Sequence, residues 1–168
     1  MMELRLSTSQ DEIREKIGHL EKSLSSVPGV FFGDTDNCPL KHSFADGMYV
    51  REIFIPKGML LVGKIHRHSH PNFLLKGEVS VVTESGGVER LKAPLSMVSP
   101  AGTKRVVYAH EDTTWVTVHV TEEKDLEKIE EQVIAKTYDE LEGFKTIEFK
   151  SDEENVYKMI EIIKEEKS

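Results

Sequence analysis

The chain has little of what disulfides and membrane spans require. It contains one cysteine, Cys38, among 168 residues, so no disulfide can form within it and a reducing compartment is expected. No apolar run approaches the roughly 20 residues that cross a bilayer. The first residues also lack the long apolar core of a secretory signal. We therefore expect a cytoplasmic protein, in a cell or in an infected host, with no membrane contact.

Positive charge is also in short supply. Lys and Arg number 22 against 30 Asp and Glu, which gives a net charge of −8 at pH 7. A protein that binds a phosphate backbone needs a basic surface, so no nucleic-acid partner is expected.

The length of the chain suits one domain with appendages. We predict an N-terminal helical segment over 1–29, a β-barrel over 30–121 and a C-terminal helical extension over 122–168.

Short β-branched runs separated by glycine and proline fill the middle of the chain. Many short strands at near-even spacing are typical of an all-β barrel or sandwich. Residues 30–47 are rich in turn formers and should form a structured loop with short extended pieces, and Pro71 should break a strand. The candidate strands are 48–55, 60–66, 72–76, 78–83, 88–92, 95–98, 104–108 and 114–120.

Amphipathic segments flank the predicted strands. Apolar residues recur at helical spacing over 9–26, where Ser9 and Glu12 fit a capping box. Two further helices are expected after the barrel, over about 122–136 and 152–166.

Three histidines at alternate positions, His66, His68 and His70, are the strongest functional signal. On a β-strand, alternate residues point the same way, so three imidazoles would share one face with Lys64. Imidazole is the commonest metal ligand, and its ordinary pKa lies near neutrality.

The spacing of Gly58, His66, His70 and Gly77, followed by Pro100-Ala-Gly102, resembles the two motifs of the cupin family, the double-stranded β-helix proteins with an RmlC-like jelly roll. The resemblance implies an all-β fold, a single cupin or jelly-roll-like β-barrel. One N-terminal and two C-terminal helices would be added to it here.

The same resemblance separates the candidate site residues that can coordinate a metal from those that cannot. Of the four metal-ligand positions of a typical cupin, only His66 keeps its identity, and His70 replaces a glutamate. Lys64 and Arg105 occupy the other two positions and carry positive charge that opposes metal coordination. The family motif does not use the position of His68.

Five short segments are also similar to a group of small cupin-like proteins from tailed phages, to which no role is assigned: Pro39-Leu-Lys-His42, Tyr49-Val-Arg-Glu-Ile-Phe-Ile-Pro56, Lys64-Ile-His66, Pro100-Ala-Gly-Thr-Lys-Arg105 and Glu111-Asp-Thr-Thr-Trp115.

One interpretation of the histidine cluster is a metal site. His66, His68 and His70 would bind a divalent transition metal, Zn, Ni, Fe or Mn, with open positions for water. A further ligand would come from one of three side chains: His119, His110 or Glu78.

A second interpretation is a metal-free site for a small anionic molecule. Arginine can grip phosphate or carboxylate with two parallel hydrogen bonds. The ligand-binding candidates are Lys64, Arg105 and Arg51. The resemblance to the epimerase branch of the cupins implies a histidine base and a tyrosine acid, for which the candidates are His66, His70, Tyr49 and Tyr108.

A third interpretation is structural, with the histidines hydrogen-bonded inside the barrel or exposed at its rim. Two functions therefore stay open. One is a small-molecule enzyme of isomerase or epimerase, lyase or oxygenase type, with or without a metal. The other is a non-catalytic phage or host binding protein with a degenerate metal site. A homodimer or other homo-oligomer is expected in either case.

Overall fold

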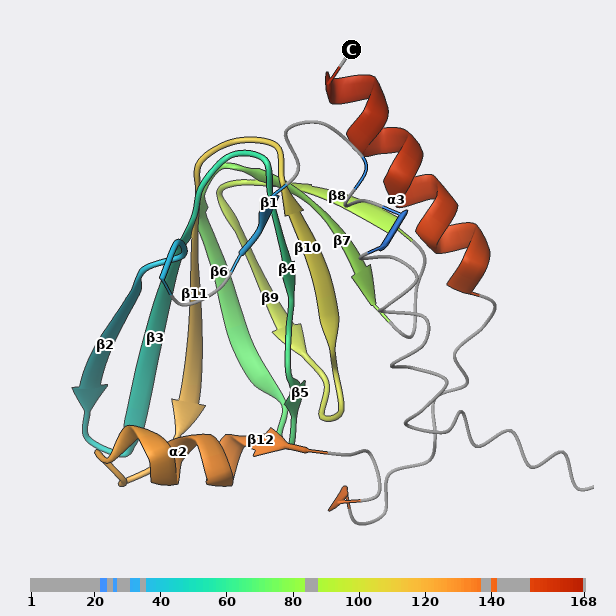
Figure 1. Cartoon of the computed structure of the whole chain (residues 1–168). Coiled ribbons are helices and arrows are strands. Elements are labelled where there is room, and N and C mark those ends of the chain that lie inside the picture. Colours follow the sequence, from blue (N-terminus) through green and yellow to red (C-terminus); the bar gives the residue numbers. More distant parts are fainter. Residues whose placement is uncertain are drawn as a thin grey trace, which may run out of the picture.

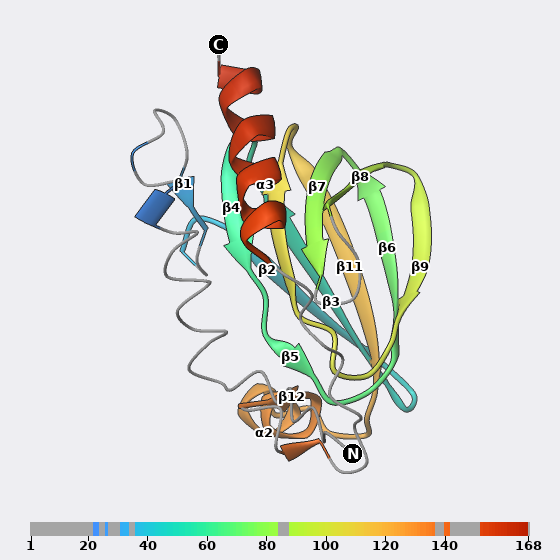
Figure 2. The same cartoon turned by 90° about the vertical axis from the view of Figure 1, so that its right-hand side faces the viewer.

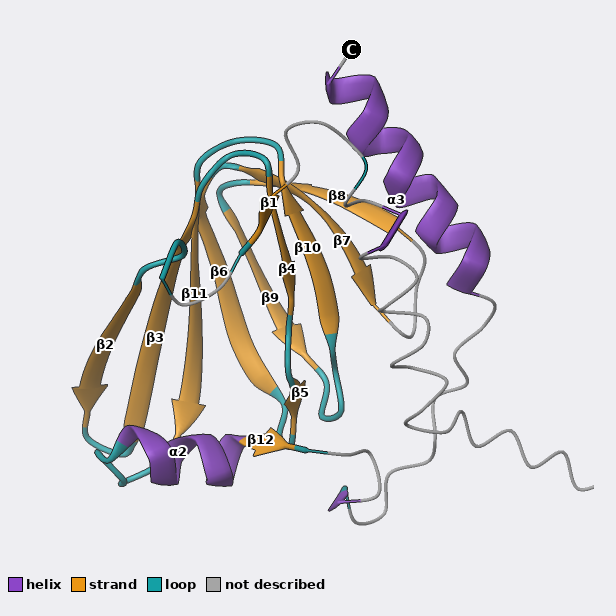
Figure 3. Ribbon diagram, viewed as in Figure 1, coloured by secondary structure: helices purple, strands orange, loops and turns teal. Residues whose placement is uncertain are grey.

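Two β-sheets packed face to face form the body of the protein, and helices cover parts of its surface (Figures 1 and 3). The structure, a computed structural model, describes residues 22–23, 26, 31–33, 36–83, 88–136, 140–141 and 152–167. The expected leading helix over 9–26 lies almost entirely outside these residues.

The first sheet, here called sheet A, has five strands in the order β1-β4-β10-β7-β8, and only the β1–β4 pair is parallel. Its strands are β1 (Phe31–Phe32), β4 (Met59–Val62), β7 (Glu78–Thr83), β8 (Val88–Lys92) and β10 (Arg105–Ala109).

The second sheet, sheet B, has five antiparallel strands in the order β2-β3-β11-β6-β9. Its strands are β2 (Leu40–Ala45), β3 (Met48–Ile55), β6 (His70–Lys76), β9 (Leu95–Ser99) and β11 (Thr113–Val120). Consecutive strands alternate between the two sheets along most of the chain, which is the arrangement of a jelly roll. The all-β, cupin-like barrel expected from the sequence is therefore present.

Three strands have the predicted bounds, Met48–Ile55, Glu78–Thr83 and Val88–Lys92. Three other expectations need correction. Residues 40–45 form a full strand, because β2 pairs with β3 along its whole length. The expected strand 60–66 is split into β4 and β5 (Ile65–His66). Pro71 lies within β6, where it is tolerated because β11 pairs with β6 only from residue 72 onward.

Glycines of the cupin-like motifs stand where the backbone needs them. Gly58, Gly77 and Gly102 all have positive φ, of 84°, 97° and 82°. L-residues other than glycine rarely adopt this conformation. At Gly77, an added Cβ would also clash with the Oγ1 of Thr113 and with the backbone of Asp112. The sharp turns between the sheets therefore depend on these residues.

An apolar core fills one part of the space between the sheets. Val79 and Val81 of β7 and Ala109 of β10 face Leu74 and Trp115 of sheet B. The thiol of Cys38 is buried in the same core. Polar side chains occupy the rest of the interior.

The two C-terminal helices are present as predicted, α2 (Leu126–Val133) and α3 (Asp152–Lys167). The Asp125 carboxylate caps α2 by accepting hydrogen bonds from the backbone N–H groups of residues 127 and 128. Figure 2 shows α3 over the outer face of sheet A, where Met159 and Ile163 pack against Leu60. None of the helices in the described part of the chain is long and apolar enough to span a bilayer.

Helix α2 lies across one end of the barrel, below β3 and β11 in Figure 1. Its buried residues Ile129 and Val133 pack against Tyr49 of β3. The short strand β12 (Ile134–Ala135) follows directly and pairs with β5, so that Ile134 lies opposite His66. The α2–β12 segment therefore closes the end of the barrel that carries the histidines.

Candidate functional site

Three histidines from three strands meet inside the barrel. His66 comes from β5, His70 from β6 and His119 from β11. Their ring centroids lie 4.4 Å apart for His66 and His70, 4.8 Å for His70 and His119, and 5.5 Å for His66 and His119. These three residues are called the histidine cluster below.

Burial favours the neutral form of each imidazole in the cluster. Loss of solvation, with the proximity of His70 and His119, lowers the pKa of His66 to about 3. Loss of solvation, with the proximity of His70 and Arg51, lowers the pKa of His119 to about 4. Desolvation also lowers the pKa of His70, and Arg105 adds to that effect. At pH 7 the cluster is therefore uncharged.

One ring nitrogen of the cluster, in His70, lacks a hydrogen-bond partner in the part of the chain that the structure describes. The Nδ1 of His70 lies 3.1 Å from the carbonyl oxygen of His68. Because a carbonyl can only accept, this Nδ1 carries the proton and the Nε2 of the neutral ring is a bare acceptor. That Nε2 is buried and has no hydrogen-bond partner among the described residues. Buried polar atoms are nearly always paired, so this nitrogen marks a place where a donor can bind.

Arg51 brings a positive charge to the edge of the cluster. It lies opposite Thr117 of β11, two residues from Tyr49 on the same face of β3. Its side chain is half-buried, and its guanidinium donates no hydrogen bond and forms no ion pair to the residues that the structure describes. Burial lowers the pKa of Arg51, while the proximity of Tyr49 and Glu130 opposes that shift.

Tyr49 connects the cluster to the exposed edge of sheet B. Its ring lies 6.1 Å from that of His119 and 5.9 Å from that of His42 on β2. The hydroxyl is hydrogen-bonded to the Nδ1 of His42 at 2.7 Å. Desolvation raises the pKa of Tyr49, so its phenol stays protonated at neutral pH.

A polar network on the other side of the cluster holds a second arginine. Arg105 donates a hydrogen bond to the Ser99 hydroxyl and lies over the ring of Trp115, 5.8 Å from its centroid. The side-chain amide of Asn72 donates to Ser99 at 2.6 Å and accepts from the Trp115 indole at 3.1 Å. Arg105 is therefore fixed by this network, whereas Arg51 is not.

His68 and Lys64, two of the predicted site residues, are exposed and lie outside the cluster. Because β5 ends at His66 and β6 begins at His70, the alternate histidines do not share one continuous strand, and His68 is exposed in the bend between them. Lys64 is also exposed and forms an ion pair with Glu130 of α2. His119 takes the third place that the alternate spacing suggested for His68.

Tyr108 and His110 lie on the opposite face of sheet A, beneath α3. The Nε2 of His110 is 2.6 Å from the Ser80 hydroxyl, and its Nδ1 is 2.7 Å from the carboxylate of Glu166. Burial and Glu166 raise the pKa of Tyr108 to about 12. Ser80 is fully buried, so this arrangement fixes α3 to the sheet and offers no exposed nucleophile.

Glu78 likewise lies apart from the histidine cluster. Its carboxylate forms an ion pair with Arg90 of the neighbouring strand β8, on the outer side of sheet A. Of the three side chains expected to add a metal ligand, His119 joins the cluster, whereas His110 and Glu78 do not.

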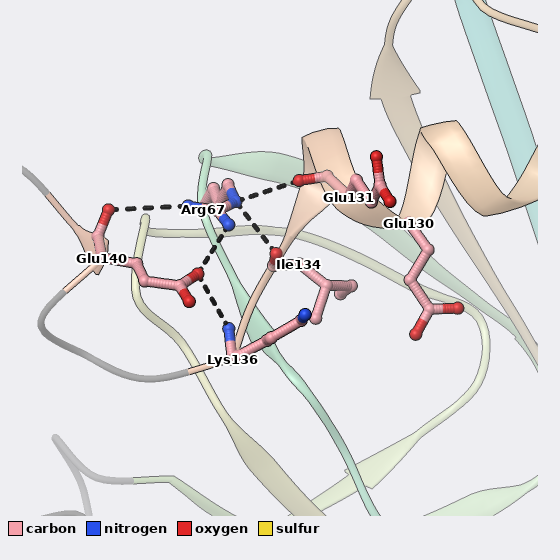
Figure 4. A pocket seen from close by; sticks show the side chains of 6 residues that line it. All are labelled: Arg67, Glu130, Glu131, Ile134, Lys136 and Glu140. Atoms are coloured by element: carbon pink, nitrogen blue, oxygen red, sulfur yellow. Dashed lines mark hydrogen bonds and ion pairs between the residues drawn. The ribbon is translucent and has the colours of Figure 1, made fainter.

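An open pocket lies at the C-terminal end of α2, and its lining does not include the histidines (Figure 4). Arg67 fills it by donating to the carbonyl oxygens of Glu131 and Ile134 and by pairing with Glu140 at 2.6 Å. These contacts satisfy the hydrogen-bond donors of the guanidinium. Arg67 therefore ties β12 and Glu140 to the end of α2, and it is not left open for a ligand.

The cluster meets only some of the requirements of a metal site. Three neutral imidazoles and an unpaired Nε2 are a suitable donor set. Within the described ranges, however, no group of three or more His, Cys, Asp and Glu side chains is arranged to hold a metal ion. Arg51 and Arg105 add positive charge nearby, and none of the carboxylates that the structure describes joins the cluster. As the side chains stand, they do not fit a resident divalent metal.

Sequence reasoning left out His42 and Asn72. His42 falls in the segment expected to be a loop, so its position opposite Arg51 became visible only with the β2–β3 register. Asn72 directly follows Pro71, where a break was expected, although its spacing from His70 and Leu74 places all three on one strand face.

No protein-family model matches the chain, and no curated protein matches it. Among solved structures, KdgF from Halomonas sp. is similar over 56% of this chain and 88% of its own, at 18% identity and a TM-score of 0.46. A cupin 2 domain-containing protein from Halorhodospira halophila covers 55% of this chain and 70% of its own, at 14% identity and a TM-score of 0.45. An RmlC-like cupin from Methanocaldococcus jannaschii covers 54% and 85%, at 14% identity and a TM-score of 0.44. These likenesses concern the fold alone, and the description of the barrel rests on its own strand order and register.

Proposed function

We propose that the barrel interior binds a small anion that also carries a hydroxyl or N–H donor. The observation that supports this most directly is Arg51, a half-buried guanidinium with no hydrogen bond or ion pair among the described residues. A carboxylate or phosphate would satisfy it with two parallel, charge-assisted hydrogen bonds.

The histidine cluster supplies the second half of the recognition. A hydroxyl or N–H group of the ligand would donate to the bare Nε2 of His70, which is buried and unpaired. Such a site discriminates strongly, because an analogue without the donor leaves the buried acceptor unsatisfied.

The protonation states favour binding over proton abstraction. An efficient general base has a pKa close to the working pH. The pKa values of about 3 for His66 and about 4 for His119 make both imidazoles weak bases. We therefore propose the non-catalytic function first, and the isomerase, epimerase, lyase and oxygenase chemistries stay hypotheses.

Binding of Arg51 to an anion can be tested with two probes that differ by one hydroxyl, glycolate and acetate. We expect glycolate to bind, with Arg51→Gln weakening it by about tenfold or more, since a charge-assisted contact is lost. Trp115, the only tryptophan, reports binding through its fluorescence, and two-dimensional NMR checks the fold. Arg90→Gln is the matched control, because it removes the same charge from the outer side of sheet A. Equal weakening by both variants, or no saturable binding, would refute the proposal.

The role of His70 has its own test. His70→Phe removes the acceptor and should abolish the preference for glycolate over acetate, whereas His68→Phe at the exposed position should leave it. Elemental analysis of protein purified without a histidine tag decides the metal question. A stoichiometric metal, with anion binding only in its presence, would replace this proposal by a metal-dependent site.

A further inference from the structure

Exposed aromatic rings line the edge of sheet B beside the proposed anion site. Phe44 of β2 is 41% exposed although it lies on the inner face of the sheet. Its ring lies 5.5 Å from that of Tyr49, with 30° between the two planes. His42, also exposed, lies against the same Tyr49 ring with an interplanar angle of 14°.

The strand register places these rings next to Arg51. His42 lies directly opposite Arg51, and Phe44 lies opposite Tyr49. Arg51 and Phe44 are thus diagonal neighbours on adjacent strands, about 7–8 Å apart, so one small molecule can span them.

The inner face of sheet B changes from exposed to buried across its strands. His42 and Phe44 on β2 are exposed, Arg51 on β3 is half-buried, and His119 and His70 on β11 and β6 are buried. Figure 1 shows β2 at the outer edge of the sheet, on the side away from α3. A ligand that reaches the histidine cluster along this face passes the rings of β2 first.

We propose that the ligand carries a planar ring that stacks on Phe44 and His42 while its anionic group binds Arg51. The ligand class is therefore a hydroxylated anion with an aromatic ring. Aromatic rings attract one another beyond the contribution of their buried area, and stacking orients a flat ring more strictly than an aliphatic one. The hydrogen bond between His42 and Tyr49 holds the His42 ring in place before the ligand arrives. This inference rests on the anion site proposed above and adds the recognition of the ring.

Mandelate and its ring-saturated analogue, hexahydromandelate, test the ring preference. Both carry the carboxylate and hydroxyl of glycolate, and they differ in whether the six-membered ring is planar. We expect mandelate to bind roughly threefold to tenfold more tightly than hexahydromandelate. Phe44→Leu should remove that preference. Phe73→Leu, at a phenylalanine exposed on the outer face of the same sheet, should keep it.

Saturation-transfer NMR gives a readout that does not depend on affinity alone. The phenyl protons of mandelate should receive magnetisation from the wild-type protein and much less from Phe44→Leu. If glycolate binds through Arg51 but the ring of mandelate brings no gain over hexahydromandelate, the ring inference fails and the anion site stands. If glycolate binding does not depend on Arg51, both are refuted. An unchanged ring preference in Phe44→Leu also overturns the inference.

Discussion

Mild acid should destabilise this protein through two histidines of its cluster. His66 and His119 have pKa values of about 3 and about 4 in the folded state, against about 6.5 for an unfolded histidine. Unfolding exposes the two imidazoles, which then take up protons below pH 6.5. The free energy of unfolding is therefore fully retained above that pH and falls as the pH drops towards the folded-state values.

The size of the effect follows from the same pKa values. At pH 5 the folded imidazoles are still neutral, while each unfolded imidazole gains about 2 kcal/mol from protonation. His66 and His119 together should lower the free energy of unfolding by about 4 kcal/mol between pH 7.5 and pH 5. Domains of this size are typically stable by about 5–15 kcal/mol, so the loss is a large share of the total.

Urea unfolding in the presence of a chelator, at pH 7.5 and pH 5, measures this loss. With an m-value of about 2 kcal/mol/M, the midpoint should fall by about 2 M from these two residues. In His66→Gln/His119→Gln the pH-dependent difference should shrink by about 4 kcal/mol, and each single variant should show about half of that. His68→Gln, which removes an exposed histidine, should behave as wild type.

Two results would refute this reasoning. One is an equal loss of stability between pH 7.5 and pH 5 in the wild type and the double variant. The other is a histidine titration by NMR in which the ring protons of His66 and His119 shift with a midpoint near 6.5. Either would mean that burial does not hold the cluster neutral.

Two further substitutions test the fold around the site. Gly77→Ala should cost about 2 kcal/mol or more, because it combines positive φ with a backbone contact, whereas Gly47→Ala, with positive φ but only a carboxylate end nearby, should cost less. Chemical denaturation of the pair gives the comparison, and equal costs would contradict it. Glu166→Ala should cost about 1–3 kcal/mol by leaving the buried His110 Nδ1 without its partner, while Glu161→Ala on the exposed side of α3 should change little. Thermal unfolding followed by circular dichroism distinguishes the two, and an unchanged midpoint in Glu166→Ala would show that the contact does not fix the helix.

The barrel was largely predictable because glycine and proline residues mark the ends of several strands. The segments 78–83 and 88–92 are bounded by Gly77, by Gly86-Gly87 and by Pro94, and the structure keeps both ranges. Strand β2 was missed because it has no buried face to produce a pattern, and five of its six residues are exposed. Its pairing with β3 makes it a strand, and that contact is not encoded locally.

For the candidate site, the sequence predicts only which residues of a single strand share a face, because side chains alternate along a strand. Tyr49 and Arg51 are two residues apart and share a face, as the structure shows. Arg105 and Tyr108 are three apart, an odd spacing that places them on opposite faces of β10, and only Arg105 lies near the histidines. His119 joins the cluster through the β11–β6 pairing, and such long-range pairings leave little trace in a single sequence.

The position of α2 and β12 also has a consequence for how the protein is made. A ribosome releases the chain from its N-terminus at about 5–20 residues per second, so every barrel strand up to Val120 emerges before the segment that closes the barrel end. Ile134, the partner of His66, comes later, as do Ile129 and Val133, which cover Tyr49. A nascent barrel therefore lacks these contacts until residues 129–135 have left the ribosome. Docking of the α2–β12 segment is therefore the step that completes the surroundings of the histidine cluster, and α3 follows later still.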